Sequence, residues 1–80
     1  NYPNPFKQHT NISFELEQAG FVSISVFDSF GKEVASLVNK QMTAGKQITE
    51  FDAEGISPGV YYYTIRANGK TDSGKLVVVR

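Results

Sequence analysis

Apolar residues recur at every second position along most of this chain, and this period of two is the feature that most limits its fold. The stretches ISFEL (12–16) and FVSISVFD (21–28) both show the alternation clearly. Successive side chains of a strand point to opposite faces, so such a pattern is typical of strands with one buried face. Val34 and Leu37 are three apart, a spacing that also admits one helical turn. The sequence therefore predicts an all-β fold.

Six segments have this strand character: 12–16, 21–28, 33–38, 47–51, 60–67 and 73–80. The polar stretch NKQMTAGK (39–46) is expected to be a connection, and a seventh strand would come from its flanks or from the turn near Thr71. Strands at intervals of about ten residues favour a β-sandwich of the Greek-key type over a barrel.

Turn residues separate the strands at three places, which are Asp28 to Gly31, Pro58-Gly59 and Asn68-Gly69. The first has the spacing of a type I turn followed by a glycine bulge, and the second fits the central positions of a type II turn. The third pair is a strong hairpin sequence. We therefore expect positive φ angles at Gly31 and Gly59.

The chain has 80 residues and is therefore expected to form one domain, over residues 1–80. It has no cysteine, so packing alone is expected to stabilise this domain. In 47–51 the buried face is ambiguous, because Phe51 lies on one face and Ile48 on the other. The predicted core takes one apolar face of each strand and comprises Phe6, Ile12, Phe14, Leu16, Val22, Ile24, Val26, Val34, Leu37, Phe51, Ile56, Tyr61, Tyr63, Ile65, Leu76 and Val78.

Charge and hydropathy argue against several classes of partner. Eight basic side chains balance eight acidic ones and are scattered, so neither nucleic acid nor an anionic membrane is an expected partner. No apolar run approaches the length of about 20 residues that inserts in a bilayer. The opening NYPNPF is stiff and non-helical, and no initiator Met precedes it. We interpret residues 1–10 as a linker junction through which a longer polypeptide enters the domain.

The side chains that could support catalysis are sparse. His9 is the only histidine and is expected to be an exposed loop residue. The carboxylates of Glu50, Asp52 and Glu54 could gather around calcium, but a solvated outer face explains them more simply. The serines lack a nucleophile elbow, and the glycines fall at turns rather than in a phosphate-binding loop. Neither an enzyme nor a cofactor is expected.

Tyr62 is the side chain that could support ligand binding. Along VYYYTI the alternation places Tyr61 and Tyr63 in the core and Tyr62 on the surface, where its ring could stack on a sugar. Aromatic residues are also favoured on strands for packing alone, and this is the simpler explanation. A carbohydrate-binding or adhesive module appended to a secreted enzyme is thus one hypothesis, and a structural spacer is another.

The order of the motifs resembles a known family over essentially the whole chain. The stretches NYPNPF, TNISFEL, VSISVFDSFGKEVASLV, AGKQITEFDA, ISPGVYYYTI and KLVVVR look like the type A C-terminal sorting domain of the type IX secretion system. The resemblance implies an immunoglobulin-like antiparallel sandwich of about seven strands, similar also to a domain of flagellar hook-capping proteins. The chain departs from the family pattern at Lys7-Gln8, where a second Asn-Pro is usual, at Phe27 and at Arg80.

The resemblance also implies a function. Such a domain directs the export of N-terminal cargo domains of the same precursor across the outer membrane, after passage through the periplasm, and its partner is the type IX machinery. The protein would then be secreted or held at the cell surface. A terminal edge strand offers backbone groups to which a receptor could add a strand, although Lys75 and Arg80 could equally protect that edge. The residues expected to be recognised are Lys75, Leu76, Val77, Val78, Val79 and Arg80.

Overall fold

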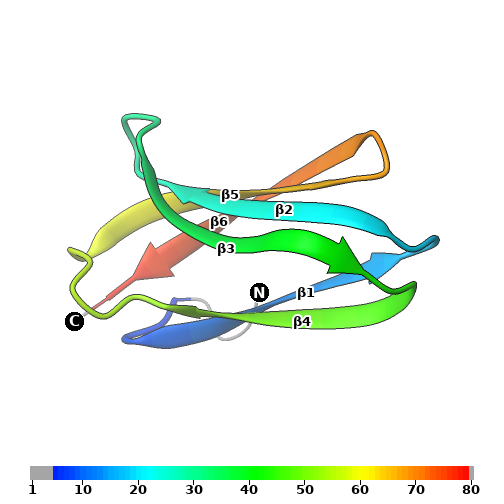
Figure 1. The fold of residues 1–80 in the computed structure, drawn as a ribbon. Helices are drawn as coiled ribbons and strands as arrows, with labels where there is room; N and C mark the ends of the chain where they lie inside the picture. The colour runs from blue at the N-terminus through cyan, green and yellow to red at the C-terminus, as the bar shows by residue number, and fades with distance from the viewer. Residues whose placement is uncertain (1–4, 80) are drawn as a thin grey trace.

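The computed structural model describes residues 5–79, which form six strands and two sheets. The strands are β1 (His9–Leu16), β2 (Gly20–Phe27), β3 (Glu33–Met42), β4 (Gly45–Asp52), β5 (Gly59–Ala67) and β6 (Lys70–Val78). The sheets have the orders β1-β4 and β3-β2-β5-β6, all neighbours are antiparallel, and the two layers pack face to face (Figure 1). The predicted all-β sandwich is confirmed, and its non-consecutive neighbours β2 and β5 are those of Greek-key connections. Residues 5–79 contain no helix that could cross a membrane.

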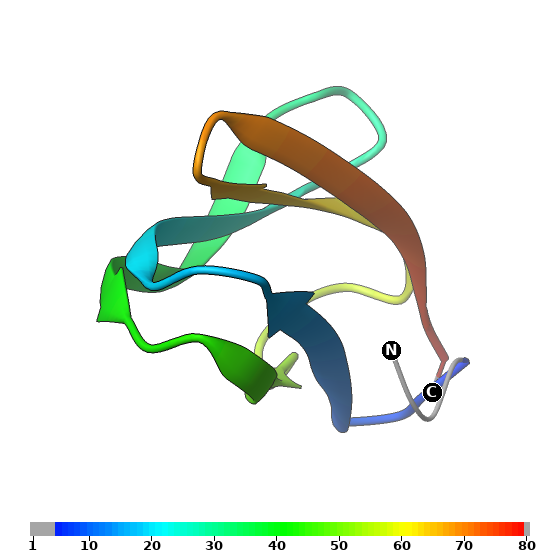
Figure 2. The ribbon, with the colours of Figure 1, turned by 90° about the vertical axis from the view of Figure 1, so that its right-hand side faces the viewer.

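The sandwich has a closed side and an open side (Figure 2). On the closed side, residues 43–44 connect the edge strands β3 and β4 directly. On the opposite side the edge strands are β1 and β6, which belong to different sheets and are not consecutive in the chain. The open side therefore depends on other segments to cover its apolar interior.

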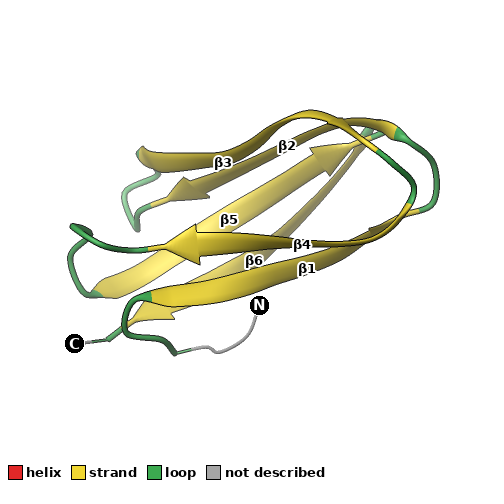
Figure 3. Cartoon of the chain, turned by 60° about the horizontal axis from the view of Figure 1, so that its bottom comes forward, coloured by secondary structure: helices red, strands yellow, loops and turns green. Residues whose placement is uncertain are grey.

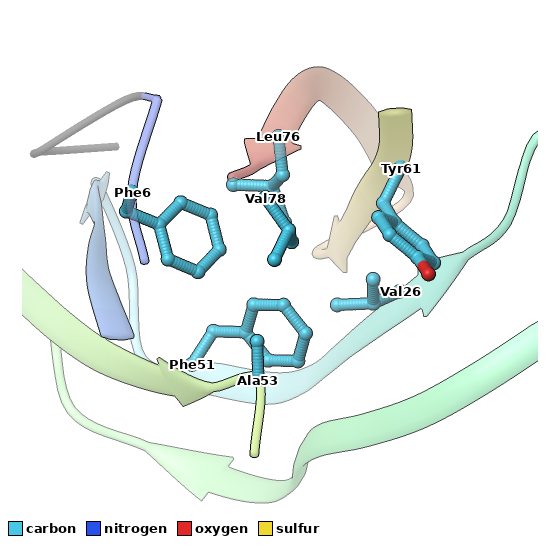
Figure 4. Packing of buried hydrophobic residues seen from close by; sticks show 7 residues of the cluster. All are labelled: Phe6, Val26, Phe51, Ala53, Tyr61, Leu76 and Val78. Atoms are coloured by element: carbon cyan, nitrogen blue, oxygen red, sulfur yellow. The ribbon is translucent and has the colours of Figure 1, made fainter. Parts of the chain in front are cut away.

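The core consists of two clusters, one at each end of the sandwich. One cluster contains Phe6, Val26, Phe51, Ala53, Tyr61, Leu76 and Val78 (Figure 4). The other contains Ile12, Leu16, Val22, Ile24, Val38 and Ile65. The rings of Phe6 and Phe51 meet edge to face with their centroids 5.9 Å apart. Phe51 is buried and Ile48 is 69% exposed, which settles the buried face of β4.

Most of the predicted core is confirmed, and its errors concentrate in β3. The pairing of β2 with β3 shifts register twice, and Val34 and Leu37 are the β3 residues that the shifts leave without a partner. Val34 is consequently exposed, which contradicts the prediction, and Leu37 is half-buried while Val38 enters the core. The three-residue spacing of Val34 and Leu37 thus reflects two β-bulges rather than a helical turn. The prediction also missed Ala53, which is fully buried.

The connection predicted at 39–46 is mostly strand. β3 continues to Met42, which pairs with Gly20 of β2, and β4 already begins at Gly45. The polar side chains that suggested a loop lie on an edge strand, where exposed polar residues also discourage pairing with other molecules. Thr71 lies inside β6, so the structure shows six strands within residues 5–79 rather than about seven.

Two of the three predicted turns have the expected geometry, and the Pro58-Gly59 turn does not. The amide of Gly31 donates to the carbonyl oxygen of Asp28 at 3.0 Å, and one carboxylate oxygen of Asp28 accepts from the amides of Phe30 and Lys32. Asn68 and Gly69 have φ angles of 53° and 76°, as a type I′ hairpin loop requires. Gly59 has a positive φ of 152°, but this differs from the value of about 80° that a type II turn requires.

Alanine at Gly31 is expected to lower the free energy of unfolding by about 1 kcal/mol. Gly31 has a φ of 87° and a Cβ there would have no atom within 4 Å, so the loss reflects backbone strain alone. Urea denaturation followed by circular dichroism measures it. Gly31→Asn is the control, since asparagine tolerates positive φ better than alanine. Gly59→Ala is expected to be destabilising as well, and unchanged midpoints in both alanine variants would contradict the assignment.

Candidate functional site

The terminal strand β6 divides the residues predicted for recognition into two groups. Leu76 and Val78 are buried and belong to the core cluster around Phe51. The side chains of Lys75, Val77 and Val79 point the other way, onto the outer face of the four-stranded sheet. Arg80 lies outside the described residues. Only half of the six predicted residues are thus placed on a surface that a partner could contact.

Cross-strand pairing gathers apolar residues around these side chains. Phe27 of β2 pairs with Tyr62 of β5, which in turn pairs with Lys75 of β6. Residues directly opposite each other share a face of a sheet. Val60 and Val77 form the adjacent cross-strand pair. We call this surface the outer-face patch, and it comprises Phe27, Val60, Tyr62, Lys75, Val77 and Val79.

The outer-face patch is open to solvent. Tyr62 is 45% exposed, and Val60 and Val79 are each 38% exposed. Phe27 and Val77 are half-buried within the same surface. Sequence reasoning missed Phe27 and Val60, although alternation along β2 and β5 places both on the face that carries Tyr62. The arrangement can bind an apolar or aromatic group, and the amine of Lys75 beside Tyr62 can approach a carboxylate.

The outer edge of β6 is already paired at its end, which corrects the expectation of free backbone groups there. The amide of Phe6 donates to the carbonyl oxygen of Val77 at 2.9 Å, and the amide of Val79 donates to the carbonyl oxygen of Phe6 at 2.8 Å. Phe6 and Val78 thereby form a parallel bridge. The cause is the burial of the Phe6 ring against Phe51 on the open side, which brings the Phe6 backbone onto β6.

The three tyrosines of β5 lie as the alternation predicted. Tyr61 is buried, and its hydroxyl donates to the carbonyl oxygen of Ser57 at 2.6 Å. Tyr62 is exposed. Tyr63 faces the interior but is only partly buried, and its ring covers Gly74, its cross-strand neighbour on β6. The register of β5 is therefore correct, with Tyr63 less buried than expected.

Burial, and to a lesser extent the nearby carboxylate of Asp72, raises the pKa of Tyr63 above its ordinary value of 10.0. The neutral phenol is thus favoured in the folded state, so this contribution to stability is complete below pH 10 and is lost as the pH rises further. We expect NMR titration of labelled tyrosine rings to show Tyr63 ionising above pH 10, and Asp72→Asn to lower its pKa. A titration midpoint of Tyr63 at or below pH 10.0 in the parent domain would contradict the prediction.

The residues considered for catalysis or metal binding are not brought together. His9 is exposed and begins β1 rather than lying in a loop. One carboxylate oxygen of Asp52 accepts from the amide of Glu54 at 2.9 Å, which is a local turn interaction. Within residues 5–79, no group of three or more acidic or histidine side chains is placed to hold a metal ion. Glu50, Asp52 and Glu54 are therefore not gathered as the calcium hypothesis requires.

A family model described as the secretion system C-terminal sorting domain matches residues 1–79. No solved structure matches the chain. The matched residues include all six strands, the segments that pair with each edge of β6 and every residue of the outer-face patch.

Proposed function

Because the chain belongs to the family of secretion system C-terminal sorting domains, we propose that the outer-face patch is the surface that the type IX machinery recognises. A domain of this family is the C-terminal signal for export of a cargo protein by the type IX secretion system. The protein that carries it is secreted or held at the cell surface. Its cargo would be the N-terminal domains of the same precursor, which would pass through the periplasm to the outer-membrane machinery.

The observation that carries this proposal is the composition of a solvent-facing surface. A domain of 80 residues must place most of its strong hydrophobes in the core. Here Val60, Tyr62 and Val79 remain exposed together on one face. Apolar residues that gather on a surface mark sites of interaction more often than single exposed ones do. The patch also includes Lys75, Val77 and Val79, which belong to the terminal segment that was expected to be recognised through its edge.

Side chains rather than backbone groups would carry the recognition. Phe6 occupies the backbone edge of β6 next to Val77 and Val79, so a partner cannot add a strand there without displacing it. The outer-face patch needs no such displacement. An aromatic or aliphatic group of the machinery would lie across Tyr62 and Val60, and a carboxylate would reach Lys75. The domain itself would act as a recognition signal for export and would perform no catalysis.

Export of a fusion tests the proposal. The domain is placed behind an unrelated periplasm-directed reporter in a host with the type IX machinery, and reporter outside the cell is quantified. We expect Tyr62→Glu to reduce export to about a tenth of the parent value, because it places a charge at the centre of an apolar contact. Ile48→Glu is the matched control, since Ile48 is an exposed apolar residue of β4 in the other sheet, and it should be exported normally.

Folding must be measured in the same variants. Both isolated domains should melt cooperatively near the parent temperature, because both substitutions lie on exposed positions. Removal of Val79 and Arg80 is a second test, and it too should reduce export while Leu76 and Val78 still fill the core. If folded Tyr62→Glu and the truncated fusion are both exported as well as the parent, recognition lies on another face.

The exposed ring of Tyr62 also supports binding of a carbohydrate as a second candidate function. Phe27 and Val60 flank Tyr62 on the outer face, so a sugar could stack across a partly apolar platform. Soluble glycans would then shift the amide resonances of β5 and quench tyrosine fluorescence. If glycans bind the parent domain and the Tyr62→Glu fusion is exported as well as the parent fusion, carbohydrate binding is favoured over recognition by the machinery.

A further inference from the structure

The open side of the sandwich is covered at one end only. Residues 5–8 cross it there, with Phe6 bonded to β6 as described above. The carbonyl oxygen of Gln8 accepts from the amide of Ala53 at 2.7 Å, which attaches the same segment to the chain just after β4. Between these contacts the ring of Phe6 fills the interior (Figure 4). The far end of the open side has no equivalent cover among the described residues.

A groove of about 520 Å³ occupies that far end. One wall is the second half of β1 with residues 17–18, and the other is the β5–β6 hairpin from Ile65 to Asp72. Phe14, Leu16, Ile65 and Ala67 provide its apolar lining. Figure 2 shows the two walls at the side where the sandwich is open. The groove lies at the opposite end from the outer-face patch, so an inference about it does not depend on the proposed function.

The backbone edge of β1 borders the groove. β1 pairs with β4 on one side, and no strand of the described residues pairs with its other side (Figure 3). On such an edge every second residue points its amide and carbonyl groups outward. The facing part of β6 is less available, because the amide of Ser73 donates to the carboxylate of Asp72 at 2.9 Å. An added strand would therefore pair with β1.

The charges around the groove are mostly negative. Glu15, Glu17 and Asp72 line it, whereas Lys70 is the one basic residue among its lining side chains. Lys46 lies opposite Glu15 on β4 and offsets part of that charge. The remaining excess of negative charge favours basic side chains in a peptide that binds in the groove. An extended segment would then direct alternate apolar residues at Phe14 and Leu16 and its basic residues at the carboxylates.

We propose that this groove binds an extended peptide segment of alternating apolar and basic residues, which pairs with the free edge of β1. The sheet β1-β4 thereby gains a third strand. The paired stretch comprises Ser13 to Leu16 of β1 and Glu17 directly after it, and it accommodates about five residues of the partner, at about 3.3 Å each. Main-chain bonds provide affinity, and the alternation of side chains provides selectivity.

A model peptide tests this inference on the isolated domain. The probe is the capped hexapeptide Val-Lys-Val-Lys-Val-Lys, with Val-Glu-Val-Glu-Val-Glu and Lys-Lys-Lys-Val-Val-Val as controls. Amide NMR spectra should show saturable shifts confined to 13–18 and 65–72, and the amides of β1 should exchange more slowly with solvent. The acidic peptide and the block peptide should bind much more weakly. Rising salt should weaken binding, because charges contribute to it.

Charge-reversal variants complete the test. The double variant Glu15→Lys and Glu17→Lys should weaken binding by about tenfold. The matched control reverses Glu33 and Glu50, which are exposed residues of β3 and β4 outside the groove, and should bind normally. Equal binding of the three peptides, or full binding by the first double variant, would overturn the proposal. Shifts in β1 that grow with domain concentration alone would show instead that a second copy of the chain occupies the groove.

Discussion

Replacing Phe6 by alanine is expected to lower the free energy of unfolding by about 3–5 kcal/mol. Phe6 is 3% exposed and packs edge to face on Phe51, so the substitution leaves a cavity on the open side of the sandwich. It also weakens the attachment of residues 5–8 to β6. The whole domain is expected to have a stability of about 4–12 kcal/mol, so this loss is a large part of it.

Urea denaturation followed by circular dichroism measures the loss at Phe6. Phe30→Ala is the matched control, because it makes the same chemical change at a side chain that is 95% exposed, on the turn between β2 and β3. Its stability should stay within about 0.5 kcal/mol of the parent. Equal midpoints for the Phe6 and Phe30 variants would show that residues 5–8 do not contribute to the core.

Alanine at Gly74 should be the second most destabilising of these substitutions, with a loss of about 1–3 kcal/mol. A Cβ at Gly74 would overlap the end of the Tyr63 ring, which lies directly over it. Tyr63 packs against both core clusters, so its ring cannot move without disturbing them. Aromatic residues that cover a glycine on the neighbouring strand are known to stabilise sheets.

A double-mutant cycle isolates this contact. Gly74→Ala should cost clearly less in a Tyr63→Leu background, because the shorter side chain leaves room for the new methyl group. The coupling between the two sites should reach about 1 kcal/mol or more. The same loss in both backgrounds would mean that the ring is not what excludes a side chain at Gly74.

The sequence predicted the parts of this fold that local patterns determine. Alternation located the strands and the orientation of Tyr61, Tyr62 and Tyr63, and short turn sequences located Gly31 and the Asn68-Gly69 loop. The errors arose where pairing between distant segments decides the outcome. The exposure of Val34 depends on two register shifts between β2 and β3, and the three-residue spacing within β3 does not by itself distinguish them from a helical turn.

In the candidate site, too, local patterns predicted some features, and pairing between distant segments determined the others. The sequence located the terminal strand, and alternation alone separates the buried Leu76 and Val78 from Val77 and Val79 on the outer face. It did not reveal the outer-face patch, because the row Phe27, Tyr62 and Lys75 joins three strands whose register only the assembled sheet defines. The pairing of Phe6 with β6 joins segments from nearly opposite ends of the chain, and local sequence patterns did not predict it either.

The parallel bridge between Phe6 and Val78 also determines how the domain carries mechanical load. Tension applied between the chain before residue 5 and the end of β6 acts along both paired segments in opposite directions. The bonds from Phe6 to Val77 and from Val79 to Phe6 are then strained together in shear, rather than being opened one after another as in a hairpin pulled from its end. Separation of these two segments under such tension therefore requires both hydrogen bonds to break together.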